Sequence, residues 1–422
     1  MMSQAAQTSA KRTFLSPLRH RDFRVFWTGL LLSSIGSQFT TVAMAWQIYE
    51  LTNSPLQIGL MGLARGVPQV AMLLFGGLLA DAVNRRKLIM CTQSMLFVVS
   101  AALALSTLAE KTTPTTLYLT AIALAFFSSL EAPARHSIVA NLVPREDLAP
   151  AMAIFSSQRY VAVIAGPAVA GIVLAVVGAS ACYAIDALSW LIMLASLVLI
   201  RTQLPSGEGR RAVSLNSLRA GFRFVLGHRV IFPFLVMDFG QNVFGNVRAL
   251  LPIYARDILA VGPKGLGILY AASAVGSLTG AIGLSLVGRI RRAGAWILVG
   301  VAIYGISIVF FATSHTLWLC VFLLAVSGVG DTISAILRST INQIATPDDL
   351  RGRMSAINSV FTNCGPQLGQ FEAGALAALV GAEMAAMSGG VIILLIVGIL
   401  VAAFPRVRDY QISPEARAKA GE

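Results

Sequence analysis

Twelve long apolar segments follow one another along this chain of 422 residues. A helix needs about 20 mostly apolar residues to cross the hydrocarbon of a bilayer. The chain is 56% hydrophobic and only 12% charged, so a water-soluble fold would lack a polar surface. The sequence therefore predicts an all-α integral membrane protein. The expected spans are residues 25–49, 56–82, 88–109, 115–141, 149–177, 180–200, 230–255, 265–288, 294–313, 317–342, 354–380 and 383–404.

The Lys and Arg residues of the loops are distributed unevenly between the two sides of the membrane. With a cytoplasmic N-terminus, only Lys111, Arg256 and Lys264 fall on the opposite side. This is the positive-inside pattern, and it predicts that both termini are cytoplasmic. It also explains the net charge of +13 without a nucleic-acid partner. No cleaved signal peptide is expected, because the first apolar segment is itself a span.

The two halves of the sequence resemble each other. ARHSIVANLVPREDLAPAMA (134–153) matches LRSTINQIATPDDLRGRMSA (337–356). The repeat predicts a six-span bundle at 1–200, a linker at 201–229 and a second six-span bundle at 230–422. Within the linker, SLNSLRAGFRFVLG places its apolar residues at helical spacing, which predicts an amphipathic helix at the cytoplasmic surface.

GGLLADAVNRRK, between the second and third spans, resembles the G-x-L-A-D-R-x-G-R-R signature of the major facilitator superfamily. This resemblance implies two pseudo-symmetric six-helix bundles. It also implies a conformational latch made by Gly77, Asp81, Arg85 and Arg86, in which the carboxylate pairs with a cation or accepts from a helix N-terminus. Ala82 stands where the signature has an arginine, which removes one ion pair. The alternative is a plain cytoplasmic anchor, which explains the cations but not the acid.

AVIAGPAVAG, in the fifth span, resembles the signature associated with antiporters of the superfamily through Gly166, Pro167 and Gly171. The proline bends the helix and the glycines allow close packing. A generic kinked span is the alternative.

Segments such as TPDDLRGRMSA (346–356) and LGILYAASAVGSLTGA (266–281) are similar to the branch that contains the enterobactin exporter and macrolide efflux proteins. These resemblances imply export.

Ten ionisable residues lie inside the expected spans, where charge marks a functional pathway by default. Glu131 and Arg135 are four residues apart and share a helix face, and Asp331 and Arg338 share a face in the tenth span. If these helices line a central cavity, Glu131 and Asp331 face each other across it and carry protons. Permanent structural ion pairs are the alternative. The remaining charges are Arg65, Arg159, Asp186, Asp238, Arg248 and Glu372.

Substrate contacts are expected where polar residues follow one another on a cavity-lining span. Asp238, Gln241 and Asn242 form such a stripe in the seventh span, although hydrogen bonding between helices is an alternative. Gln38, Arg65 and Phe361 are further candidates for substrate binding.

These features predict a secondary transporter of the bacterial inner membrane that exports an amphipathic drug-like or siderophore-like molecule by proton antiport and alternating access. A proton-coupled uptake symporter of the same fold is the alternative. The sequence contains no nucleotide-binding loop and no cluster of metal ligands, so neither a cofactor nor an enzymatic activity is expected. Protons, a small molecule and the bilayer are the expected partners of a monomeric protein.

Overall fold

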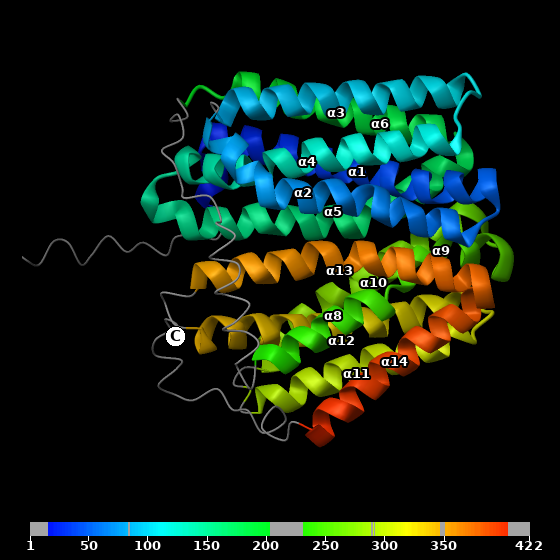
Figure 1. Cartoon of the computed structure of the whole chain (residues 1–422). Helices are drawn as coiled ribbons and strands as arrows, with labels where there is room; N and C mark the ends of the chain where they lie inside the picture. Colours follow the sequence, from blue (N-terminus) through cyan, green and yellow to red (C-terminus); the bar gives the residue numbers. More distant parts are fainter. Residues whose placement is uncertain are drawn as a thin grey trace, which may run out of the picture.

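The computed structural model describes residues 16–82, 85–202, 231–287, 290, 292–346 and 351–403. Within these ranges all regular secondary structure is helical (Figure 1). The linker helix expected at 214–227 lies outside the described residues. Among the described helices, seven are by themselves long and apolar enough to cross a membrane.

The helices form two bundles, which are drawn one above the other in Figure 1. The first bundle contains α1 (Arg21–Thr52), α2 (Pro55–Ala82), α3 (Arg85–Leu108), α4 (Pro114–Leu142), α5 (Leu148–Val176) and α6 (Ala179–Leu199). The second contains α8 (Ile231–Phe244), α9 (Leu251–Ile253), α10 (Gly262–Val287), α11 (Ala293–Ala312), α12 (Leu317–Ala345), α13 (Arg351–Val380) and α14 (Ala382–Ala403). Short 3-10 turns lie at Ser16–Arg19, Arg145–Asp147 and Val247–Ala249, and a π-helical turn at Tyr254–Ile258.

The seventh span is the one place where a predicted continuous helix is wrong. Instead of one helix over 230–255, α8 stops at Phe244 and the chain continues through a 3-10 turn, α9 and a π-helical turn. Gly245 lowers helix propensity at this point, and the Asn246 side chain donates to the Pro366 carbonyl oxygen (2.6 Å). The Tyr304 hydroxyl donates to the Gly245 carbonyl oxygen (2.5 Å), so the break is held by hydrogen bonds from α11 and α13.

Both bundles use the same packing scheme. In the first bundle α1 packs on α5 and α6, α3 packs on α4 and α6, and α2 packs on α4. In the second bundle α8 packs on α13 and α14, α11 packs on α12 and α14, and α10 packs on α12. The outward faces carry exposed apolar side chains, such as Leu286 (81%) and Leu379 (82%), which suit a lipid environment.

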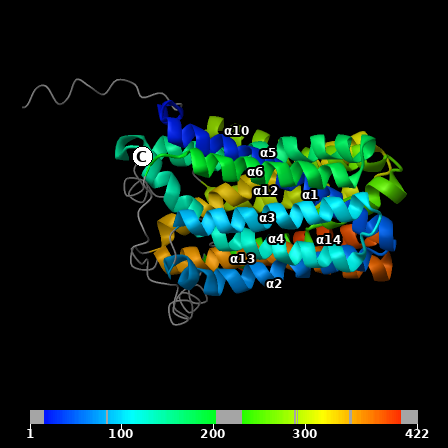
Figure 2. The ribbon, with the colours of Figure 1, turned by 90° about the horizontal axis from the view of Figure 1, so that it is seen from above.

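The bundles meet along two seams, α2 against α13 and α5 against α10, which lie at opposite edges of the molecule (Figure 2). We call the end at which α1 begins and α14 ends the terminal end, and the opposite end the far end. Glycines let the backbones touch near the far end: Gly59 lies against Gly374, and Gly171 lies against Gly267. The bundles are therefore tightly packed at the far end.

Candidate functional site: a polar cavity between the bundles

A cavity of about 800 Å³ lies between the two bundles. Its walls come from the middle of α5 on one side and from α8, α10 and α12 on the other. The lining residues of α5 and α10 lie on the terminal side of the Gly171–Gly267 contact, so this seam closes the cavity toward the far end. A cavity of this size falls in the range of pockets that hold drug-sized molecules.

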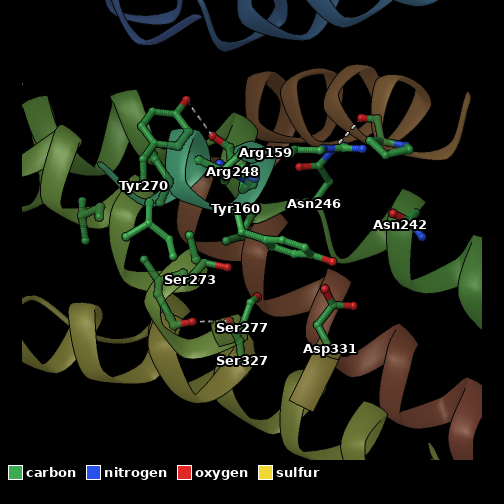
Figure 3. A pocket seen from close by; sticks show the side chains of 18 of the residues that line it. Arg159, Tyr160, Asn242, Asn246, Arg248, Tyr270, Ser273, Ser277, Ser327 and Asp331 are labelled. Atoms are coloured by element: carbon green, nitrogen blue, oxygen red, sulfur yellow. Dashed lines mark hydrogen bonds between the residues drawn. The ribbon is translucent and has the colours of Figure 1, made fainter. Parts of the chain in front are cut away.

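The cavity wall combines apolar side chains with a few polar groups (Figure 3). Four of the lining residues are arginine or aspartate: Arg135, Arg159, Arg248 and Asp331. Hydroxyl and amide groups surround them, and Figure 3 shows Asp331 at a different side of the pocket from Arg159 and Arg248. Such a wall suits a molecule that has both an apolar body and polar ends.

A polar network connects the second-bundle residues of the site. Gln241 Nε2 donates to Asp331 Oδ1 (2.6 Å), and Arg338 Nη2 donates to Asp238 Oδ1 (2.5 Å). Arg338 Nη1 also reaches Gln241 Oε1 (3.4 Å). Arg338 therefore pairs with Asp238 on α8 and not with Asp331 on its own helix. In the described part of the chain, Asp331 has no ion-pair partner and only one hydrogen bond.

Asp331 also borders a second, smaller cavity of about 280 Å³. This cavity is lined by Asp238, Arg338 and further polar residues of α12 and α13. Because Asp331 and Asn242 border both cavities, the network around Arg338 separates two adjoining spaces.

Glu131 does not face the cavity, so the expectation that it lies opposite Asp331 is wrong. Its carboxylate is fully buried and forms the ion pair with Arg135 that the four-residue spacing suggests. Thr92 Oγ1 (3.0 Å) and Gln93 Nε2 (2.8 Å), both on α3, donate to its other oxygen. These donors from α3 hold the acid behind the cavity wall, whereas Arg135 itself lines the cavity.

The predicted substrate-binding residues divide into two groups. Gln241 and Asn242 line the main cavity, and Asp238 lines the smaller one. The other three candidates are not among the lining residues and contact protein groups: Gln38 packs on Gly166, Arg65 Nη2 lies 3.7 Å from Met44 Sδ, and Phe361 packs edge-to-face on Phe239 with centroids 5.4 Å apart.

The two sequence signatures lie at different ends of the molecule. Gly171 packs on Gly267 near the far end, and Pro167 lies inside α5 one turn away. Of the predicted latch, Arg86 Nη2 donates to the carbonyl oxygens of Leu197 (2.8 Å) and Val198 (3.3 Å) on α6. The side chains of Asp81 and Arg85 and the surroundings of Gly77 are outside what the structure describes.

Several lining residues had no assigned role in the sequence-based prediction. They include two arginines and several hydroxyl-bearing residues: Arg159, Tyr160, Arg248, Ser273, Ser277, Tyr304 and Ser327. The arginines carried a usable signal, because a charge inside a span is a functional candidate by default. The serines and tyrosines carried none, since such residues also pack between helices.

Two bundles of six spans each, around a central polar cavity, define a membrane transporter of the major facilitator type. The family model described as "transmembrane secretion effector" matches residues 12–420. The chain therefore belongs to this family of the major facilitator superfamily, and it is a multi-pass membrane protein. The family and its relatives are membrane transporters, so the prediction that the chain is not an enzyme is confirmed.

Curated relatives and solved structures agree with this assignment. The chain is 27% identical over 395 residues to the enterobactin exporters EntS of Shigella dysenteriae and of Escherichia coli K12, covering 94% of this chain and of each relative. Its fold matches a bacterial homologue of the lysosomal transporter Spinster, with a TM-score of 0.73, 16% identity and coverage of 94% and 99%. It also matches a POT family transporter with a TM-score of 0.74, 12% identity and coverage of 92% and 96%. The chain is thus homologous to major facilitator efflux transporters.

Proposed function

We propose that the protein exports an amphipathic small molecule across the bacterial inner membrane in exchange for protons, by alternating access of the central cavity. The observation that carries the proposal is the environment of Asp331. This carboxylate lines the cavity, accepts one amide hydrogen bond and has no ion-pair partner in the described residues. A carboxylate in such a place can hold a proton or bind a donor group of the transported molecule, but not both.

The relatives support the direction and the kind of transported molecule. The curated relatives are named as exporters of enterobactin, and in the Gly166-Pro167…Gly171 pattern Pro167 and Gly171 contact Gly267 of the second bundle, while Gly166 packs on α1. The unequal distribution of loop cations supports cytoplasmic termini. With that orientation the far end is periplasmic, and the cavity lies on the cytoplasmic side of the closed seam, ready to receive a molecule from inside.

Asp331, and not Glu131, is the proton carrier in this proposal. Glu131 is fixed by Arg135 and by two donors from α3, so it positions Arg135 at the cavity wall. Asp238 is held by Arg338 in the same way. An exporter needs one acid that can change its partner during the cycle, and Asp331 is the cavity acid that is free to do so.

The test uses the full chain in proteoliposomes with an imposed pH gradient and enterobactin as the first probe. We expect wild-type transport to depend on the gradient, and the Asp331→Asn variant to lose at least about 90% of that dependence. Asp186→Asn is the matched control: Asp186 is a buried acid that accepts from Thr40 and Ser100 (2.8 Å each), away from the cavity. Equal gradient dependence in wild-type protein and Asp331→Asn would refute proton exchange at this residue.

The proteoliposome test also decides between export and the uptake alternative. In an exchanger, adding the transported molecule on one side of the membrane moves protons from the other side to that side. In a symporter, the protons cross the membrane together with the molecule. A pH-sensitive dye inside the vesicles distinguishes the two directions. Proton movement in the same direction as the molecule would support the symporter.

A further inference from the structure

Two arginines in the cavity have no acidic partner. Arg159 lies on α5 of the first bundle, and Arg248 lies in the 3-10 turn at the break in the seventh span of the second bundle. Both side chains are exposed to the space between the bundles. Neither forms an ion pair within 4 Å with any carboxylate of the described residues, although Arg248 interacts electrostatically with Asp331 over a longer distance.

Elsewhere inside the spans the chain neutralises its cavity-facing arginines. Arg135 pairs with Glu131, and Arg338 pairs with Asp238. A guanidinium at membrane depth without a counter-ion in contact costs free energy, so the lack of a direct ion pair at Arg159 and Arg248 favours a ligand that supplies the negative charge. Asp331 is the one acid among the residues that line the main cavity, and it lies at another side of the pocket (Figure 3).

The broken span holds Arg248 in place. The Tyr270 hydroxyl donates to the Arg248 carbonyl oxygen (3.2 Å), and the Tyr270 ring lies under the guanidinium, with the ring centroid 5.5 Å from Cζ. The Gly245 and Asn246 contacts described above fix the turn that precedes it. A cation–π contact orients a guanidinium but leaves its N–H groups free to donate.

We propose that Arg159 and Arg248 form an oxyanion-binding subsite for the transported molecule. A guanidinium binds a carboxylate, sulfonate or phosphate through two parallel hydrogen bonds, and a pair of guanidiniums adds charge complementarity. Apolar side chains of the same cavity, among them Phe155, Val163 and Leu269, accommodate the body of the molecule. The substrate class is therefore an amphipathic organic anion. This inference rests on the proposed function, because it assumes that the cavity holds the transported molecule.

The charge balance of the cavity adds a second requirement. Protonation of Asp331 makes the cavity more positive, which on its own strengthens the binding of an anion. Proton exchange therefore requires the same molecule to contact Asp331 through a hydrogen-bond donor that the proton displaces. The transported molecule then has an oxyanion at one end and a donor group, such as a hydroxyl or an amine, at the other.

The test measures binding to the purified full chain by fluorescence anisotropy, without any gradient. Fluorescein, an anion at pH 7.5, is compared with rhodamine 123, a cation built on the same ring system. We expect the wild-type protein to bind fluorescein at least about 10-fold more tightly than rhodamine 123. Arg159→Gln and Arg248→Gln should each weaken fluorescein binding about 10-fold, while rhodamine 123 binding stays within about 2-fold. Arg292→Gln, an exposed arginine outside the cavity, is the control that removes the same charge.

Three outcomes would overturn the inference. The first is a wild-type protein that does not prefer fluorescein, and the second is fluorescein binding that neither substitution weakens. The third is equal weakening of both dyes, which would indicate a general change of the cavity. Arg248→Lys, which keeps the charge but loses the planar pair of donors, should lie between wild type and Arg248→Gln. Since binding is measured without a gradient, failure here is independent of the Asp331→Asn transport result.

Discussion

Arg338 and Asp238 form an ion pair whose members lie 100 residues apart and whose side chains are only 7% and 17% exposed. Removing one member leaves the other charged, poorly solvated and without its counter-ion. We expect Asp238→Asn to destabilise the protein by about 3 kcal/mol, seen as a lower midpoint of thermal unfolding in detergent. The double variant Asp238→Asn/Arg338→Gln should recover most of the loss, because it removes both charges.

An exposed pair provides the comparison for this prediction. Arg21 and Asp22 form an ion pair at 3.1 Å with the arginine 46% exposed, so Arg21→Gln should cost less than about 1 kcal/mol. Equal stability losses for Asp238→Asn and Arg21→Gln, or a double variant that is less stable than both single ones, would show that burial does not control the strength of the Arg338 pair.

Residue patterns predicted local partners but not distant ones. The four-residue spacing of Glu131 and Arg135 places them on one helix face, and they do form an ion pair. The donors from Thr92 and Gln93 turn Glu131 away from the cavity, and these depend on how α3 packs on α4. Since such contacts arise from tertiary packing, sequence spacing alone placed Glu131 in the wrong environment.

At the level of elements, α5 and α10 pack with almost no space between their backbones. A Cβ atom at Gly267 would lie 2.6 Å from the Pro167 carbonyl oxygen and 2.9 Å from Gly171 Cα. Both atoms belong to the backbone of α5, so they can move away only if the whole helix moves. Gly267→Val should therefore push α5 and α10 apart and disfavour the state that is closed at the far end. We expect at least a 10-fold loss of transport without a comparable loss of thermal stability.

Opening of the far end is measured in whole cells with a membrane-impermeant maleimide. The reporter is Ser273→Cys on the cavity wall, in a background without the four native cysteines. Gly267→Val should raise the labelling rate several-fold. Gly283→Val, on the same helix but with open space around its Cβ position, should not change it. Unchanged labelling in Gly267→Val would mean that the glycine contact does not control closure.

The helices themselves were largely predictable from hydropathy, because about 20 apolar residues in a row have few other solutions. Eleven of the predicted spans begin and end within four residues of a helix in the structure. The seventh predicted span does not match a single helix. Its break could not be predicted from Gly245 and Asn246, because both residue types also occur inside continuous helices. Their effect here depends on Tyr304 and Pro366, which lie far away in the sequence.

At the scale of the whole molecule, one set of polar contacts joins the two bundles at the far end. The Tyr49 hydroxyl, at the end of α1, hydrogen-bonds to the Asp257 carboxylate of the second bundle. Arg256 lies over the Tyr49 ring, with Cζ 5.4 Å from the centroid, and donates to the Tyr49 carbonyl oxygen (3.3 Å). Alternating access requires these contacts to break when the far end opens.

Removal of the Tyr49 hydroxyl should therefore shift the equilibrium between the two states. A hydrogen bond to a charged group stabilises by about 1.5 kcal/mol, so Tyr49→Phe should raise the ratio of far-end-open to far-end-closed molecules about 10-fold. Spin labels on the exposed far-end residues Glu110 and Thr313, one in each bundle, report the separation by pulsed electron resonance. We expect a larger population at long distances in Tyr49→Phe.

Tyr118→Phe is the matched control, because the Tyr118 hydroxyl bonds to the Gln57 carbonyl oxygen (3.0 Å) within the first bundle. This bond also lies near the far end but does not cross between the bundles, so both states keep it. Its loss should lower stability without changing the distance distribution. If both variants shift the distribution equally, the change reflects general loosening of the far end. If neither does, the glycine seams and other contacts between the bundles, such as the hydrogen bond from Gln370 Nε2 to the Ile58 carbonyl oxygen, hold the far end closed, and the polar contacts at Tyr49 contribute nothing to the choice of state.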